Sequence, residues 1–180
     1  IFDRTDFRPG EVSARTGAAA FHYIERSIDL ALAGEVAAVT TAPINKEALH
    51  AAGIMYPGHT EIFADRTNAS RACMFQYSEE VRASFVTTHV GLGEVPGLLT
   101  VERILDVIEL TAAAMLRIRG TKPKLAVLGL NPHAGEHGLF GQREEERIII
   151  PAMEQARERG IELEGPLPPD TAFLPWRRRS

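Results

Sequence analysis

The sequence predicts an α/β fold, in which a mostly parallel sheet carries helices on both faces. The prediction rests on three units in which an apolar run leads into a polar loop and then into a helical pattern. The apolar runs are residues 36–40, 81–87 and 124–130, and their loops contain TAPINKEALH, THVGLGEVPG and NPHAGEHGLFG. Strands joined through helices pair in parallel, and ligands bind beyond the carboxyl ends of such strands. We therefore expect the three loops to converge on one edge of a single sheet.

Helices are predicted where apolar residues recur every three or four positions between typical capping residues. The long predicted helices cover residues 13–33, 100–119 and 143–159, and a glycine follows each of them, at Gly34, Gly120 and Gly160. Ser13 and Asn45 are candidate N-caps, and a further helix opens near His59. Pro151 should kink the last helix or divide it into two pieces, because a proline inside a helix removes a backbone hydrogen bond.

Composition excludes several classes of function. The chain has 180 residues, 44% of them hydrophobic, and a formal net charge of −4, which fits one globular domain or two small lobes. Its basic residues are scattered apart from Arg177–Arg179, so no surface for nucleic acid is predicted. No stretch approaches the roughly 20 apolar residues of a membrane helix, and the single Cys73 suits a reducing compartment. We expect a cytoplasmic protein that binds neither nucleic acid nor a membrane.

Two histidines stand where predicted strands run into loops. His89 ends the sequence TTH, and His133 ends NPH in the Gly-rich loop. A rigid backbone suits a metal ligand, because a metal needs donors at fixed positions. Either histidine alone could equally be a hydrogen-bonded residue at a strand end. The pair favours a metal site, although the spacing does not specify the metal.

A second candidate site lies at GHTE, where His59 and Thr60 open a predicted helix. Free N–H groups at a helix N-terminus beside a histidine form a site for phosphate or carboxylate, with Thr60 as a possible N-cap. The alternative is a capping threonine beside a surface histidine. Lys46 lies in the first turn of another predicted helix, which suggests a nearby anion or a simply solvated lysine. The glycines of GLGEVPG do not have the spacing of a dinucleotide-binding loop.

Five stretches taken in order resemble successive motifs of the 4-hydroxythreonine-4-phosphate dehydrogenase family, which includes related D-threonate and D-erythronate 4-phosphate dehydrogenases. The stretches are TAPINKEALHAAG, YPGHTEIFAD, VTTHVGLGEVP, LGLNPHAGEHGLFG and EGPLPPDTAF. The resemblance assigns residues 1–173 to the central part of a dehydrogenase domain and leaves residues 174–180 as a tail without resemblance.

The resemblance implies a fold, a reaction and two sets of binding residues. The fold is the two-lobed α/β/α structure of isocitrate and isopropylmalate dehydrogenases, with the active site in the cleft of a homodimer. The implied metal ligands are His89 and His133, and the residues implied to contact a small phosphorylated hydroxy acid are His59 and Thr60. The implied cofactors are NAD or NADP and a divalent metal, which is zinc, magnesium or cobalt. The reaction is oxidation and decarboxylation of a substrate such as 4-phosphohydroxy-L-threonine, and neither catalytic nor NAD(P)-binding residues are assigned.

The family's flanking motifs have no counterpart in this sequence. Members begin with a GDPAGIGPE-like segment and continue to a YHDQG-like segment that supplies a third metal-binding histidine, whereas this chain starts at Ile1 and ends at Ser180 without them. We therefore expect a central fragment with a sheet incomplete at both ends. Two hypotheses remain open: a dehydrogenase of this family, or a non-catalytic folded fragment that binds only metal or small anions.

Overall fold

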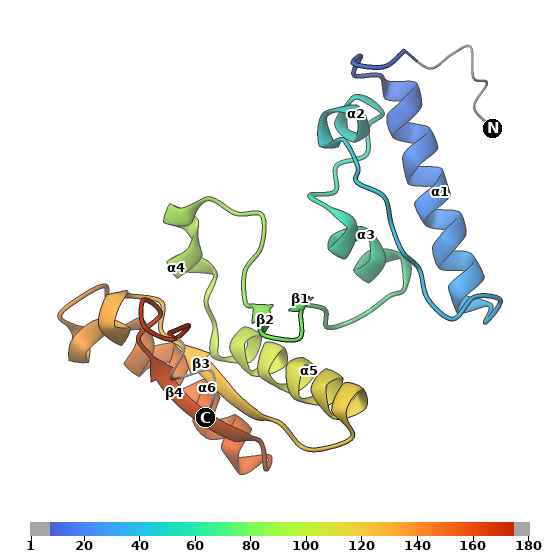
Figure 1. Ribbon diagram of the computed structural model, residues 1–180. Coiled ribbons are helices and arrows are strands. Elements are labelled where there is room, and N and C mark those ends of the chain that lie inside the picture. Colours follow the sequence, from blue (N-terminus) through green and yellow to red (C-terminus); the bar gives the residue numbers. More distant parts are fainter. Residues whose placement is uncertain (1–7, 175–180) are drawn as a thin grey trace. The chain divides into compact units, whose positions relative to one another are not determined.

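The computed structural model describes residues 8–174, and the chain divides into two compact units, Ile1–Ala72 and Cys73–Ser180 (Figure 1). The first unit contains helices α1 (Ala14–Leu32), α2 (Lys46–Ala51) and α3 (His59–Arg66). The second contains β1 (Met74–Tyr77), β2 (Arg82–Phe85), the 3₁₀-helix η2 (Leu92–Glu94), α4 (Val95–Leu98), α5 (Val101–Arg119), β3 (Lys124–Leu128), the 3₁₀-helix η3 (Pro132–Gly138), the π-helix η4 (Glu145–Ile149), α6 (Ile150–Glu158) and β4 (Glu162–Leu167). No helix between residues 8 and 174 has the length and apolarity needed to span a bilayer.

Helix α1 packs on α2 and α3 through a small apolar core. Ile24 and Ile28 are buried against Ile62 of α3. The α2 contact is closer, because a Cβ atom at Gly17 would overlap the carbonyl group of Ala48. The predicted cap of α2 is confirmed, since the side chain of Asn45 accepts a hydrogen bond from the Ala48 N–H at 2.9 Å.

The strand predicted at residues 36–40 is wrong. These residues form no strand, and most of their side chains, including Val36, are exposed. A strand is held by hydrogen bonds to a neighbouring strand, and the described part of the first unit provides no such neighbour. The apolar run therefore remains an extended connection between α1 and α2.

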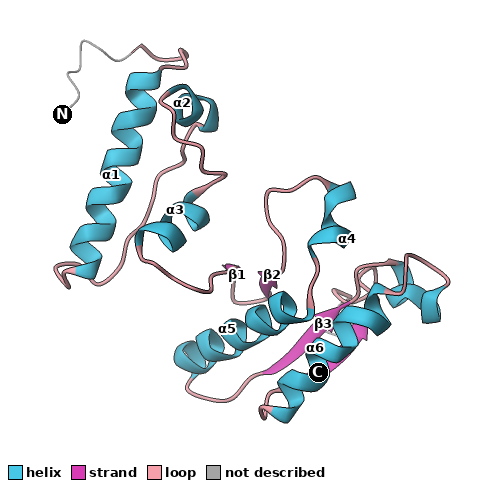
Figure 2. Ribbon diagram, turned by 180° about the vertical axis from the view of Figure 1, so that it is seen from behind, coloured by secondary structure: helices cyan, strands magenta, loops and turns pink. Residues whose placement is uncertain are grey.

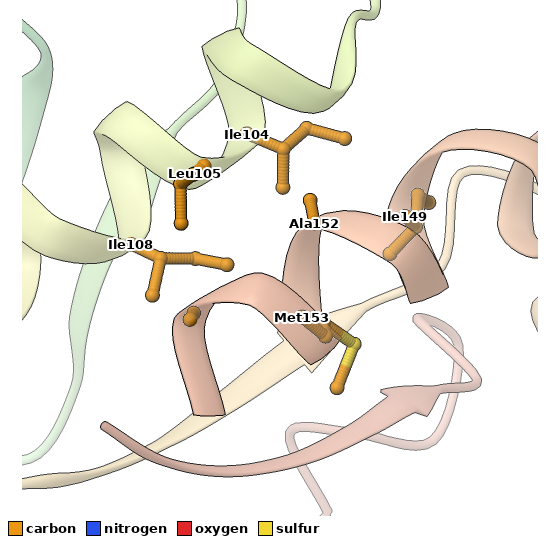
Figure 3. Packing of buried hydrophobic residues seen from close by; sticks show 7 residues of the cluster. Ile104, Leu105, Ile108, Ile149, Ala152 and Met153 are labelled. Atoms are coloured by element: carbon orange, nitrogen blue, oxygen red, sulfur yellow. The ribbon is translucent and has the colours of Figure 1, made fainter. Parts of the chain in front are cut away.

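The core of the second unit lies between α5 and the last helix (Figure 3). Ile104, Leu105 and Ile108 of α5 are buried against Ala152 and Met153 of α6. The predicted ends of α5 are confirmed: Thr100 accepts a hydrogen bond from the Arg103 N–H at 3.0 Å, and Gly120 ends the helix with a left-handed φ of 71°. The predicted division at Pro151 is not observed: a π-helical turn at Glu145–Ile149 leads directly into α6, and both Ile149 and Ile150 have right-handed helical backbone angles.

Four strands form two separate sheets in the described chain, which Figure 2 colours by secondary structure. Strand β1 pairs with β2 in antiparallel fashion, and β3 pairs with β4 in parallel fashion. The α/β class and the strands expected within 81–87 and 124–130 are confirmed, but β1 and β4 were not predicted. The expectation of one mostly parallel sheet is wrong for residues 8–174, because no ladder there joins β2 to β3.

We expect Gly17→Ala to destabilise the first unit by about 1–3 kcal/mol, since its methyl group has to displace the backbone of α2. Denaturant unfolding monitored by circular dichroism measures this change. Ala18→Ser is the matched control, because Ala18 is exposed on the same turn of α1. Equal stability of the two variants would contradict the close packing of α1 on α2.

Candidate functional site

His59 is the first residue of α3, and the preceding Gly58 is the N-cap. The N-cap predicted at Thr60 is wrong: Thr60 lies inside the first turn, since the carbonyl group of Gly58 already accepts a helical hydrogen bond from the Ile62 N–H at 3.3 Å. Gly58 has an extended backbone at this position. His59 is therefore placed directly at the helix N-terminus.

His59 also lines a cavity of about 220 Å³ within the first unit. The remaining lining comes from α1 and from residues 39–44, and it includes the hydroxyl-bearing Ser27, Thr40 and Thr41. The Nε2 atom of His59 is buried and has no hydrogen-bond partner in the described structure. A buried ring nitrogen without a partner is costly, so this atom is suited to a ligand that enters the cavity.

Other residues singled out in this unit lie outside the cavity. Thr60 is partly buried in α3, and Lys46 is exposed at the start of α2, but neither lines it. His22 and His50 are exposed on α1 and α2. The structure thus brings His59 together with the TAPIN segment, and it does not bring Thr60 or Lys46 into the same cavity.

The loop after β3 contains an unusual left-handed turn in the second unit. Five consecutive residues, His133–His137, have φ between 41° and 78°. Residues other than glycine rarely adopt left-handed backbone angles, because the Cβ atom then lies too close to the following carbonyl oxygen. This costs about 1–2 kcal/mol per residue. Only Gly135 of the five escapes this cost. Strain of this kind is typical of binding sites that the surrounding structure holds in place.

Two buried glutamates hold the beginning of this loop. Glu145 is 1% exposed, and its carboxylate accepts hydrogen bonds from the Asn131 N–H at 2.8 Å and the Asn131 side-chain amide at 3.0 Å. Glu144 accepts a second bond from that amide at 3.0 Å and one from the Gln142 N–H at 2.8 Å. Gly135 allows the loop to approach, because a Cβ there would lie 2.6 Å from Glu145 Oε2.

The pKa of Glu144 is lowered, although its side chain is buried. Burial by itself raises its pKa, but the hydrogen bonds from the Gln142 N–H, its own backbone N–H and the Asn131 amide, together with the charge of Arg147, have the larger combined effect. The pKa of Glu144 is therefore below its ordinary value of 4.5. Glu144 stays ionised at neutral pH and accepts the hydrogen bonds that fix Asn131.

His133 is oriented by neighbours within the left-handed turn. Its Nδ1 atom lies 2.7 Å from Glu136 Oε1, and its ring meets the edge of Phe140 at a centroid distance of 5.8 Å. A carboxylate that accepts the Nδ1–H of a histidine leaves Nε2 as the lone-pair donor, which is the usual arrangement around a metal-bound histidine. The His133 side chain is about half exposed, at 54%.

His89 also lies in a loop rather than at the end of a strand. Strand β2 ends at Phe85, four residues earlier, just as β3 ends at Leu128, five residues before His133. His89 is exposed and has a left-handed φ of 59°. Between residues 8 and 174 there is no group of three or more His, Cys, Asp or Glu side chains that could hold a metal ion. A metal site at His89 and His133 therefore stays a prediction.

Sequence reasoning missed the residues that support the loop. The spacing of His133 and Glu136, three positions apart, is a signal for their contact within a single turn. Glu144 and Glu145 gave no such signal, because a glutamate run at the start of a helix is ordinarily solvated. The thiol of Cys73 is partly buried, and this burial raises its pKa.

The comparisons with known proteins agree on one family. Its sequence model, described as pyridoxal phosphate biosynthetic protein PdxA, matches residues 1–180. D-threonate 4-phosphate dehydrogenase of Pectobacterium atrosepticum is 44% identical over 172 residues, which make up 96% of this chain and 52% of the relative. 4-hydroxythreonine-4-phosphate dehydrogenase of Trichlorobacter lovleyi is 44% identical over 170 residues, 94% of this chain and 50% of the relative.

Solved structures of similar sequence are also dehydrogenases. The crystal structure of 4-hydroxythreonine-4-phosphate dehydrogenase from Klebsiella pneumoniae superposes with a TM-score of 0.86 at 46% identity, covering 98% of this chain and 54% of that one. Terephthalate 1,2-cis-dihydrodiol dehydrogenase from Burkholderia xenovorans is more distant, with a TM-score of 0.61 at 31% identity, covering 94% and 54%. The chain spans about half the length of the curated relatives it matches.

Ionised Glu144 should stabilise the second unit at neutral pH and lose this effect in acid. Because its pKa is lower in the folded than in the unfolded chain, the unfolded chain binds the proton first as the pH falls below about 4.5. The free energy of unfolding, measured by denaturant titration between about pH 7 and about pH 3, should therefore fall more steeply for the unmodified chain than for Glu144→Gln. Glu154→Gln, at an exposed position on α6, is the control. Identical pH profiles for the unmodified chain and Glu144→Gln would contradict this role.

Proposed function

The chain belongs to the PdxA family, and on that premise we propose that it forms part of an NAD(P)-dependent dehydrogenase acting on a phosphorylated hydroxy acid. The family membership confirms the resemblance found in the sequence motifs. The names of relatives at 44% identity specify D-threonate 4-phosphate or 4-hydroxythreonine-4-phosphate, and both compounds are phosphorylated hydroxy acids. For this chain we propose a substrate such as 4-phosphohydroxy-L-threonine, in the biosynthesis of pyridoxine.

The observation that carries the proposal is the buried, unpartnered Nε2 atom of His59. A protonated Nε2 donates a hydrogen bond to an anionic oxygen, and the helix N-terminus at His59 favours negative charge. Thr40 and Thr41 carry further hydroxyl donors on the wall of the same cavity. These groups support His59 as a contact for the substrate phosphate. Thr60, which follows His59 in the first turn of α3, is proposed as a second contact for the substrate.

A divalent metal is the second part of the proposal. His133, with Nδ1 held by Glu136, would offer Nε2, and His89 would be the second ligand. Imidazole ligands suit zinc or cobalt better than magnesium, which prefers oxygen. When bound, such a metal supplies a Lewis acid that lowers the pKa of the substrate hydroxyl group. Glu136 keeps the ring of His133 in one tautomer and orientation for that contact.

The remaining features of the proposal rest on family membership. Hydride transfer to NAD or NADP turns a secondary alcohol into a ketone, and a ketone β to a carboxylate readily loses carbon dioxide. We also propose that the protein has the α/β/α fold of isocitrate and isopropylmalate dehydrogenases, that it is cytoplasmic and that it forms a homodimer. Exposed Leu92, Leu98 and Leu139 in the second unit support a dimer, because a partner would cover them.

We expect His59→Ala to weaken binding of 4-phosphohydroxy-L-threonine by about tenfold or more, because a hydrogen bond to a charged group contributes about 1.5–3 kcal/mol. Isothermal calorimetry measures the affinity. His50→Ala, an exposed histidine on α2, should bind as the unmodified chain does. Unchanged affinity of a folded His59→Ala variant would refute the phosphate contact. Substrate binding without reduction of NAD or NADP would favour the alternative of a binding fragment that lacks catalysis.

Zinc titration tests the metal ligands separately. His89→Ala and His133→Ala should each lower zinc affinity by about tenfold or more, and Glu136→Gln should have a smaller effect in the same direction, since it removes only the partner of a ligand. His22→Ala on α1 is the control. If both single variants bound zinc like the unmodified chain, the two histidines would not be its ligands.

A further inference from the structure

Glu144 and Glu145 are neighbouring buried carboxylates, but they contact the loop after β3 in different ways. One oxygen of Glu144, Oε2, accepts both of its bonds, from the Asn131 amide and from the Gln142 N–H beyond the left-handed turn. Glu145 uses both oxygens: Oε1 accepts from the backbone N–H of Asn131 at 2.8 Å, and Oε2 accepts from the Asn131 amide at 3.0 Å. Of the two glutamates, Glu145 is therefore the one bonded to the backbone that leads into the turn.

Glu145 also contacts the middle of the turn. It lies against Gly135, where an added Cβ would be 2.6 Å from Oε2 of Glu145. Gly129, which follows β3, lies near the other oxygen, because a Cβ there would be 3.1 Å from Oε1. Glycine at both positions leaves room for the side chain. The carboxylate of Glu145 thus lies between the start and the middle of the loop.

Gly135 connects Glu145 to the two neighbours of the His133 ring. Its carbonyl group accepts a hydrogen bond from the Phe140 N–H at 3.2 Å, and the Phe140 ring contacts His133. Gly135 also directly precedes Glu136, whose Oε1 lies 2.7 Å from Nδ1 of His133. A displacement of Gly135 would therefore move both groups that orient the ring.

Glu145 is itself held by the core of the second unit. It is the first residue of the π-helix η4, whose last residue, Ile149, is buried in the cluster that contains Ile104 and Met153 (Figure 3). Side chains on helices are placed more precisely than those on loops. Glu145 is thus a fixed point against which the loop can be positioned.

We propose that Glu145 is a positioning residue for His133, an inference that rests on the proposed role of His133 as a metal ligand. The carboxylate of Glu145 fixes the beginning and the middle of the left-handed turn, and the turn holds the His133 ring in one orientation. Glu144 stabilises the loop but does not determine the orientation of the ring. Loss of a residue that acts on a metal through its ligand typically lowers metal affinity by about 10–100-fold.

Glu145→Gln is the first test, because it keeps the size of the side chain but replaces one acceptor oxygen with a donor NH2 group. The Asn131 amide cannot rotate to accept this donor, since its own NH2 group also bonds to Glu144 at 3.0 Å. We expect the turn to lose its left-handed angles. In NMR, Ala134 and Glu136 should lose the strong NOE between amide and α protons that a positive φ produces. Glu144→Gln is the matched control, because the single remaining oxygen can accept both bonds of Glu144.

Gly135→Ala tests the same contact from the side of the loop. Its methyl group would meet Oε2 of Glu145, so the turn should be displaced although the carboxylate is unaltered. Gly160→Ala is the matched control: Gly160 has a φ of 79° and Gly135 one of 78°, but nothing lies within 4 Å of a Cβ at Gly160. The NOEs of the turn should be lost in Gly135→Ala and retained in Gly160→Ala.

Zinc titration by calorimetry measures the consequence for His133 in variants that denaturant unfolding shows to be folded. Glu145→Gln and Gly135→Ala should lower zinc affinity by about tenfold or more, and the two controls by less than about twofold. A role in stability alone would leave the zinc affinity of the folded chain unchanged. Gly135→Ala decides the question if Glu145→Gln does not fold.

Two results would overturn the proposal. One is unchanged NOEs of the turn in folded Glu145→Gln or Gly135→Ala. The other is equal zinc affinity of these variants and their controls, in a chain that binds zinc. Failure of the unmodified chain to bind zinc would instead refute the proposed metal site, and the NOEs would still show whether Glu145 positions the turn that carries His133.

Discussion

The loop that carries His133 depends on the hydrogen bonds between Asn131 and the buried carboxylates of Glu144 and Glu145. Four residues other than glycine adopt left-handed backbone angles in this loop, at a cost of about 4–8 kcal/mol in total. Hydrogen bonds to charged groups contribute about 1.5–3 kcal/mol each, so the bonds from Asn131 offset a cost of the same order. The π-helical turn at Glu145–Ile149 begins at one of the two acceptors and therefore belongs to the same arrangement.

The left-handed turn His133–His137 is strained, and within it Nδ1 of His133 lies 2.7 Å from Oε1 of Glu136. The buried carboxylates of Glu144 and Glu145 stabilise the beginning of the loop that contains this turn. In the first unit, the buried Nε2 atom of His59 lacks a partner in the cavity beside Thr40 and Thr41. In both units, a locally unfavourable feature occurs at a histidine of a family motif.

The helices could be predicted from sequence because their signals are local. Asn45 and Thr100 bond to an N–H three residues ahead, and Gly120 ends α5 through its own backbone angle. The histidines of the candidate sites could be named from motifs for the same reason. The left-handed turn could not be predicted, since it depends on Glu144 and Glu145, more than ten residues from Asn131. Motifs thus identify the side chains of a site, whereas distant residues determine their geometry.

The errors in the sheet have a related physical origin. An apolar run becomes a strand only when another segment pairs with its backbone, so the run at Val36–Thr40 remained irregular without a neighbour in the described first unit. Strand β4 was missed for the opposite reason: its sequence ELEGPL contains Gly and Pro, yet pairing with β3 gives it a strand conformation. Pairing partners, more than local composition, therefore decide which segments of this chain are strands.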